Sequence, residues 1–196
     1  MFGNFFKKKK PVTNFLVVAI LNAKVMPIDR GERYEDPLME WLEKNGLGEV
    51  TGGGTLMTEG KEIESCDVEI QLKALDDSAI NAIKAFLEQC GAPRGSKLII
   101  ESTGQKIPFG TNEGLAVYLN GTDLPDEVYQ QSDLNVVYEE FNRLLGSHGS
   151  VQSHSQLATE TALYMYGRSF EEMKQCLMPF MESYPLCQKA RMVQIA

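Results

Sequence analysis

The protein has 196 residues, of which 43% are apolar, 23% charged and 9% aromatic. These are ordinary globular values, and they exclude a disordered chain, a collagen-like repeat and a disulfide-rich miniature protein. Four of the nineteen basic residues are consecutive, at Lys7–Lys10, so the rest of the chain carries fifteen basic against twenty-seven acidic residues, or −12. This balance argues against a nucleic-acid binder, which needs a basic face to meet phosphates.

Residues 1–12 are expected to form a flexible basic tail. Phe2, Phe5 and Phe6 stand before the lysine run, whereas a secretory signal has its charges first and a longer apolar core after them. The longest apolar run, Phe15–Leu21, is too short to cross a bilayer. The four cysteines form no C-x-x-C pair, which favours reduced thiols. The sequence therefore predicts a cytoplasmic protein without stable membrane insertion, although the tail could touch an anionic membrane surface.

The first half of the chain predicts six elements in the order β-α-β-β-α-β. Strands are expected at Phe15–Leu21, Glu49–Met57, Glu62–Leu72 and Lys97–Glu101, and helices at Glu35–Asn45 and Asp77–Gln89. Apolar residues recur at helical spacing in both helices, and Gly46 is a typical helix stop. In the third strand apolar residues alternate with Asp67, Glu69 and Gln71, so one face should be buried and the other polar.

The second half repeats this order. Strands are expected at Leu115–Leu119, Val151–Leu157, Thr161–Tyr166 and Arg191–Ile195, and helices at Asp133–Leu145 and Ser169–Ser183. Thr13-Asn14 through Leu21-Asn22 recurs as Thr111-Asn112 through Leu119-Asn120, at a constant offset of 98 residues. Further along, Val68, Ile70 and Leu72 align with Ala162, Tyr164 and Tyr166. We therefore predict an internal duplication of a unit of about 95 residues, a usual size for a small domain.

The order β-α-β-β-α-β is that of the ferredoxin-like fold, an α+β arrangement in which an antiparallel sheet carries both helices on one face. One such unit is expected at residues 13–101 and a second at 111–196. Between them, residues 102–110 should form a linker, because Gly104 and Pro108 are turn-forming residues. The open faces of the two sheets could pack on each other in a compact pseudo-dimer, or the units could be arranged like beads on a string.

Acidic residues gather on two predicted elements. Glu62, Glu64, Asp67 and Glu69 lie on one strand, and Glu35, Asp36, Glu40 and Glu43 lie on the first helix. Carboxylates at these places are compatible with a plain solvated surface, but four of them on a rigid sheet would also steer a cationic partner. They are the candidate contacts for a basic protein partner, with the strand acids ahead of the helix acids.

A candidate ligand site consists of Gly52, Gly53, Gly54 and Thr55, together with the loop residue Arg94. Backbone N–H groups of a glycine-rich stretch can cradle a phosphate, and an exposed arginine can meet an anion. The stretch lacks the Gly-Lys-Ser/Thr of a P-loop and lies within a predicted strand. A bulge, or a close approach of another backbone, is therefore the structural alternative.

No catalytic residue, metal site or cofactor is predicted. His148 and His154 do not have the spacing of a zinc motif, and Ser153 beside His154 lacks a nucleophile elbow. Tyr164 and Tyr166 could stack bases, as in RNA-binding modules of this fold, but the acidic balance opposes nucleic-acid binding. We therefore expect a protein that is not an enzyme.

The start Met1–Phe6 with its following lysines, the acidic body and the missing catalytic motif resemble small cytosolic immunity proteins of bacterial toxin systems. The resemblance implies a protein that neutralises a basic toxin by covering its active site with an acidic surface. Toxins that act on nucleic acids or nucleotides often have basic clefts, because their substrates are anionic. The alternative is a small-molecule or nucleotide sensor, whose ligand would sit at the junction of the two units in a cleft lined by the glycine triplet and the linker.

Overall fold

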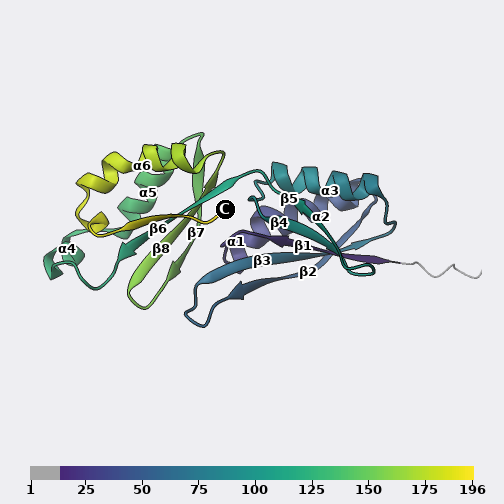
Figure 1. The fold of residues 1–196 in the computed structure, drawn as a ribbon, viewed down its shortest axis with the longest axis horizontal. Coiled ribbons are helices and arrows are strands. Elements are labelled where there is room, and N and C mark those ends of the chain that lie inside the picture. The colour runs from purple at the N-terminus through teal and green to yellow at the C-terminus, as the bar shows by residue number, and fades with distance from the viewer. Residues whose placement is uncertain (1–13) are drawn as a thin grey trace, which may run out of the picture.

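The structure, a computed structural model, describes residues 14–196 as two α+β units that lie side by side (Figure 1). The expected tail at residues 1–12 lies outside the described residues. Each unit has one antiparallel sheet with its main helices on one face. The predicted fold class, a tandem duplication of a ferredoxin-like unit, is confirmed.

The first unit contains five strands. Its elements are β1 (Phe15–Leu21), α1 (Pro27–Arg30), the π-helix η1 (Gly31–Glu35), α2 (Asp36–Lys44), β2 (Gly48–Met57), β3 (Ile63–Leu72), α3 (Asp77–Gln89), β4 (Ser96–Ile100) and β5 (Gln105–Phe109). The strand order is β2-β3-β1-β4-β5, with every pair antiparallel. Val17 pairs with Ile70 and Ala19 with Val68, so these buried side chains share the face that α2 and α3 cover.

The first helical segment begins earlier than the expected helix at Glu35–Asn45. It runs from Pro27 to Lys44 through α1, one π-helical turn and α2. Pro27 stands at the first helical position, where its missing N–H leaves no hydrogen bond unmade. At the other end, Gly46 has a φ of +65° and closes the helix, as its position predicted.

The expected linker at 102–110 is largely a strand. β5 pairs along its whole length with β4, so the first unit extends to Phe109. Pro108 is tolerated because β5 lies at the edge of the sheet, where one side of the strand donates no hydrogen bonds. The true connection is a tight turn at Gly110, whose φ is +98° and where any Cβ would collide with the carbonyl oxygen of Pro93. The glycines do mark turns, as predicted. The segment between those turns, however, is an edge strand and not a linker.

The second unit has the same core order with two additions. Its elements are β6 (Glu113–Asn120), α4 (Asp126–Gln131), α5 (Leu134–Leu145), β7 (Gly149–Gln156), β8 (Glu160–Gly167), α6 (Phe170–Ser183), the 3₁₀-helix η2 (Pro185–Cys187) and β9 (Arg191–Gln194). The strand order is β7-β8-β6-β9. Asp133 and Ser169 cap α5 and α6 by accepting hydrogen bonds from backbone N–H groups. The short helices α4 and η2 are additions that the sequence analysis did not predict.

The two sheets differ in which residues face the helices. Under the helices of the second unit lie Leu163 and Met165 of β8, not Ala162, Tyr164 and Tyr166. The predicted alignment of these three residues with Val68, Ile70 and Leu72 is therefore wrong by one position. A one-residue shift along a strand moves every side chain to the opposite face. Ala162, Tyr164 and Tyr166 consequently lie on the open face of the second sheet.

The two units meet in an asymmetric way. The open face of the second sheet packs on the first unit, and five of its residues join that unit's core: Ala116, Tyr118, Ala162, Tyr164 and Tyr166. The hairpin that joins β2 to β3 and the loop after β1 provide the opposing contacts. Among residues 14–196, no residue of the second unit's core packs on the open face of the first sheet. The arrangement is thus neither a face-to-face pseudo-dimer nor two separate beads.

Candidate binding surface

The open face of the first sheet is a candidate binding surface. We define the open sheet face by six residues: Leu16, Val18 and Ile20 of β1, Asp67 and Glu69 of β3, and Ile99 of β4. Cross-strand pairing places them together, because Val18 lies opposite both Glu69 and Ile99, and Ile20 lies opposite Asp67. Leu16 is 39% exposed. The surface therefore combines an apolar centre with carboxylates along one side.

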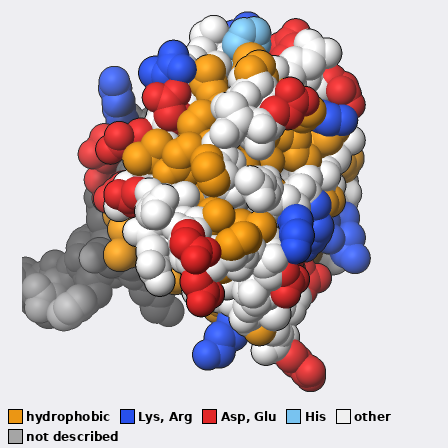
Figure 2. Space-filling view, turned by 90° about the vertical axis from the view of Figure 1, so that its left-hand side faces the viewer, with side chains coloured by type: hydrophobic (Ala, Val, Ile, Leu, Met, Phe, Trp, Pro, Cys, Tyr) orange, Lys and Arg blue, Asp and Glu red, His pale blue; other side chains and the backbone are white. Residues whose placement is uncertain are grey.

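Charge is divided across this face. The carboxylates of Asp67 and Glu69 lie on the side toward β2, where Glu49 adds a third. Lys97 and Lys106 lie on the opposite side, since Lys97 pairs with Ile20 and Lys106 with Ile99. The far end of the second unit shows no comparable division: red and blue side chains are interspersed there with exposed apolar ones (Figure 2).

The four predicted strand acids do not form one surface. Asp67 and Glu69 belong to the open sheet face, as the alternation predicted. Glu64 falls at an irregularity in the pairing of β2 with β3, where the strand has one extra residue. Glu62 precedes β3 and is turned into the junction between the units.

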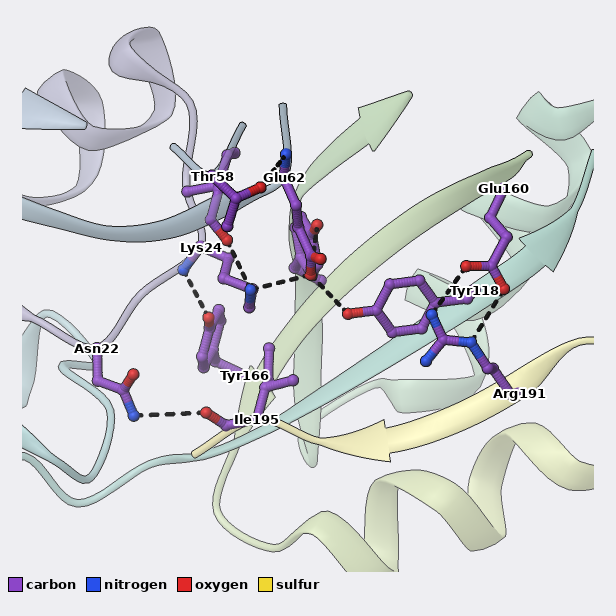
Figure 3. A network of polar contacts seen from close by, with 11 residues as sticks. Asn22, Lys24, Thr58, Glu62, Tyr118, Glu160, Tyr166, Arg191 and Ile195 are labelled. Atoms are coloured by element: carbon purple, nitrogen blue, oxygen red, sulfur yellow. Dashed lines mark hydrogen bonds and ion pairs between the residues drawn. The ribbon is translucent and has the colours of Figure 1, made fainter. Parts of the chain in front are cut away.

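Glu62 is held at the junction by residues of both units (Figure 3). The Tyr118 hydroxyl donates to its Oε1 at 2.7 Å, and the ammonium of Lys24 pairs with the same oxygen at 3.0 Å. Burial raises the pKa of the Glu62 carboxyl, but these two hydrogen bonds and the charge of Lys24 outweigh burial and hold the pKa below its ordinary value. The backbone N–H of Lys24 also donates to the hydroxyl of Tyr166 at 2.7 Å. Glu62 is therefore part of the joint and not of a docking surface.

A second ion pair flanks this network. Arg191 donates to both carboxylate oxygens of Glu160, at 2.9 and 2.8 Å, and its guanidinium lies 3.5 Å from the ring centroid of Tyr118. The pairing lowers the pKa of Glu160. In Figure 3 the Tyr118 hydroxyl points toward Glu62, while Arg191, paired with Glu160, lies at the tyrosine ring. The tyrosine is thereby fixed in its orientation toward the first unit.

The helix acids lie on the other side of the first sheet. Glu35 accepts a hydrogen bond from Nε of Arg30, so its charge is neutralised within the unit. Asp36, Glu40 and Glu43 are exposed on α2. Because α2 covers the face opposite to the open sheet face, one flat partner surface cannot meet both acidic sets.

The glycine triplet is a place of close approach, not a phosphate cradle. Arg30, only 9% exposed, lies over Gly53 and donates to the Thr55 hydroxyl at 2.8 Å. A Cβ on Gly53 would collide with the Glu35 carboxylate and the Asp67 carbonyl. Gly52 and Gly54 lie beneath the carboxylates of Glu69 and Asp67, which would repel an anion. The structural alternative raised from the sequence is thus the one that the geometry supports.

Arg94 also has a structural role. Its guanidinium pairs with Glu113 at the start of the second unit, and its carbonyl accepts from the side chain of Asn22 at 2.8 Å. The residue is far in the fold from the glycine triplet and ties the connection at Gly110 to both units. The predicted anion site is therefore not assembled.

The remaining chemical candidates are likewise dispersed. Ser153 and His154 are neighbours on β7 and face opposite sides of the sheet, so they cannot act as nucleophile and base. Ser153 accepts from the backbone N–H of Met26, and His148 lies 3.2 Å from a carboxylate oxygen of Glu172. Within residues 14–196 no cluster of three His, Cys, Asp or Glu is arranged to hold a metal. In the same range no helix is long and apolar enough to cross a membrane.

Sequence reasoning missed the residues that join the units. Tyr118 belongs to no motif that the sequence analysis considered, and Tyr164 and Tyr166 were considered as base-stacking residues. They are 0% and 1% exposed and lie against the first unit, so they are not available to stack bases. The one available signal was the alternation of tyrosines along β8, which marks a sheet face that is covered by something large.

Comparison with known proteins gives no family. No family model and no curated protein matches the chain. Among solved structures, the first two RNA-recognition-motif domains of a yeast poly(U)-binding protein are 10% identical with a TM-score of 0.24, covering 92% of this chain and 99% of that one. A provisionally assigned monooxygenase from Fusobacterium nucleatum is 9% identical with a TM-score of 0.33, covering 94% and 92%. Another from Lactobacillus acidophilus is 11% identical with a TM-score of 0.32, covering 94% and 95%. None of these values supports a functional assignment.

Proposed function

We propose that this chain is a non-catalytic binding protein that docks a basic protein partner on the open sheet face. In its specific form, the protein is an immunity protein that neutralises a bacterial toxin by covering a basic active-site cleft. One observation carries the proposal: a sheet face, left open by the described residues 14–196, on which apolar side chains stand beside carboxylates. Such a combination suits a protein interface, where apolar contacts give affinity and charges select the partner.

The carboxylates of this face are available to a partner. Among the described residues, neither Asp67 nor Glu69 takes part in an ion pair within the chain, in contrast to Glu35 and Glu62. A guanidinium or ammonium of a partner could pair with them at the rim while apolar groups cover Val18 and Ile20.

The lysines on the other side of the face set the orientation. Lys97 and Lys106 would repel a uniformly basic surface, so the partner's cations must meet the β3 side. The expected partner is therefore basic at its cleft and neutral or acidic at one rim. A toxin with a cleft for an anionic substrate would supply the basic part of this distribution.

A charge-reversal comparison tests the proposal. The tagged chain and two double variants are used for capture from the lysate of the host, with salt elution and quantitative mass spectrometry. Asp67→Lys with Glu69→Lys alters the open sheet face, and Asp36→Lys with Glu40→Lys places the same charge change on α2. We expect one basic protein that the wild type and the α2 variant recover, and a loss of at least about tenfold with the sheet variant.

The immunity role needs a second result. The recovered protein, expressed alone, should be toxic, and co-expression of the wild type but not of the sheet variant should restore growth. Equal recovery by all three chains would reject the sheet face, and loss with the α2 variant alone would move the contact to the helix side. If the recovered partner is not toxic, the chain is still a binding protein, but the immunity role is rejected.

The alternative function, a small-molecule sensor at the junction, retains one supporting observation. A cavity of about 380 Å³ lies where α1 of the first unit approaches α5 and β7 of the second. Its lining contains neither the glycine triplet nor residues 102–110, so the expected composition of the cleft is wrong although its location is near the junction.

A further inference from the structure

The cavity of about 380 Å³ at the boundary of the units, here the junction cavity, has a lining with a definite chemistry. It draws Asp29 from α1, Leu134 and Tyr138 from α5, Gln152 and His154 from β7, and Leu163 from β8. The volume lies near the lower end of the range of ligand pockets, about 300–1,000 Å³. A molecule with one ring and a short chain would fit.

One polar side chain of this lining lacks a partner. The pairing of β7 with β8 shifts between Val151 and Ser153, so Gln152 is the extra residue of a bulge. Gln152 is 7% exposed, and its Oε1 has no hydrogen-bond partner. A buried carbonyl oxygen without a partner is unfavourable by about 1–3 kcal/mol. Rotation of the carboxamide exchanges its oxygen and its NH₂ group, so Gln152 can present an acceptor to an occupant of the cavity.

Three side chains give the otherwise polar lining an apolar part. Leu163 is 2% exposed, whereas Leu134 and Tyr138 on the outer turn of α5 are 36% and 42% exposed. Helix α5 therefore leaves a leucine and an aromatic ring accessible next to a buried leucine. A compact apolar group would cover all three.

The charge of the lining favours a cation. Asp29 is its one carboxylate, and among residues 14–196 that carboxylate forms no ion pair. His154 can accept a hydrogen bond through an unprotonated ring nitrogen. The ring of Tyr138 adds a face that attracts ammonium groups. A phosphate would meet Asp29 unfavourably, so a nucleotide fits this cavity poorly.

We infer that the junction cavity binds a compact organic amine. Its ammonium group contacts Asp29 and the Gln152 carboxamide, and its apolar body covers Leu134, Tyr138 and Leu163. The inference develops the alternative, sensor function and shares no residue with the open sheet face. Failure of one therefore leaves the other standing.

Three probes of one shape test this inference. Phenethylamine, 2-phenylethanol and 3-phenylpropionate share a phenyl ring on a two-carbon chain but differ in the charge of the end group. Each is titrated into the full chain and followed by amide chemical shifts in NMR. We expect phenethylamine to shift the amides around Gln152 and Tyr138 and to bind about tenfold more tightly than the alcohol, and we expect the carboxylate to bind most weakly.

Variants separate the charge from the apolar contacts. Asp29→Asn should remove the preference for phenethylamine over the alcohol, whereas Glu32→Gln, an exposed acid on the same helical segment outside the lining, should leave it unchanged. Tyr138→Ala should weaken all probes. The inference is overturned if the three probes bind alike, if shifts occur away from the cavity, or if none binds. If Glu32→Gln also removes the preference for phenethylamine over the alcohol, the amine is attracted by the net negative charge of the chain and not by the cavity.

Discussion

At the scale of single residues, partners distant in sequence decide where a charge can act. Glu62 and Asp67 are close along the chain, yet Glu62 is held by Tyr118, 56 residues away, while Asp67 remains on the open sheet face. Glu35 is neutralised by Arg30 in the same manner. The sequence pattern predicted which strand or helix carries each acidic residue. The pattern could not identify the carboxylates that are neutralised within the chain, because tertiary packing supplies their partners.

The glycine triplet provides a direct test of close approach. Gly53→Ala places a Cβ against the Glu35 carboxylate and the Asp67 carbonyl, and should lower the free energy of unfolding by about 1–3 kcal/mol. The matched control is Gly52→Ala, whose nearest atom would be Glu69 Oε2 at 3.4 Å, an ordinary contact. Urea unfolding of both variants measures the difference. Equal stability of the two would contradict the packing described for Arg30 and Glu35.

The Tyr118 hydroxyl should stabilise the chain in a pH-dependent way. Tyr118→Phe removes a hydrogen bond to an ionised carboxylate and should cost about 1.5–3 kcal/mol at pH 7. The bond holds the pKa of Glu62 below its ordinary value of 4.5, so this stabilisation is complete above that pH and is lost as the pH falls through the lowered pKa.

The measurement is urea unfolding of wild type and Tyr118→Phe between pH 7 and pH 3. Tyr129→Phe is the control, because the Tyr129 hydroxyl contacts Asn120 and a backbone N–H but no carboxylate. Its effect should be the same at every pH. A Tyr118→Phe effect that does not shrink in acid would show that Glu62 is not the group involved.

At the scale of elements, periodicity was a sound guide where strands and helices alternate regularly. All twelve predicted elements exist. The four main helices and the central strands present apolar faces to the two cores, whereas β2 and β7 contribute few core side chains. The errors fall where local patterns are ambiguous. β5 contains Pro108 and reads as a turn, and in β8 both faces are apolar or aromatic, so its register could slip by one residue.

Attachment of β5 depends on the turn that follows it. Gly110→Ala adds strain at a φ of +98° and a collision with the Pro93 carbonyl, so it should destabilise the chain and loosen β5. Gly104→Ala has a φ of +70° but no atom within 4 Å, and should cost only about 1 kcal/mol. Hydrogen exchange of the β5 amides is expected to accelerate in the first variant more than in the second. Similar exchange in both would argue against the close approach.

At the scale of the whole molecule, the units should unfold together. The tyrosine face of the second sheet is part of the first unit's core, so separation would expose large buried side chains. Trp41, stacked on Phe86 at 4.9 Å, is the only tryptophan and reports on the first unit alone. Its fluorescence and the far-ultraviolet circular dichroism should therefore give coincident urea transitions.

A variant at the joint supplies the comparison. Tyr166→Ala removes a side chain that is 1% exposed and whose hydroxyl accepts a hydrogen bond from the Lys24 backbone N–H. The substitution should split or broaden the transition. Two separate transitions in the wild type would instead indicate that each unit is stable alone. The sequence could not predict this coupling, because a local sequence pattern does not indicate which sheet face of one unit is covered by the other unit.

The unequal use of the two sheet faces limits how the two copies can diverge in evolution. Val18 and Ile20 of the first copy correspond to Ala116 and Tyr118 of the second, at the same offset of 98 residues. Selection at the second pair must preserve the fit to the other copy, whatever the protein binds. Selection at the first pair is free to follow an external target. Descendants of this gene should therefore change rapidly at the first pair and slowly at the second, and retargeting by directed evolution should begin on the first sheet.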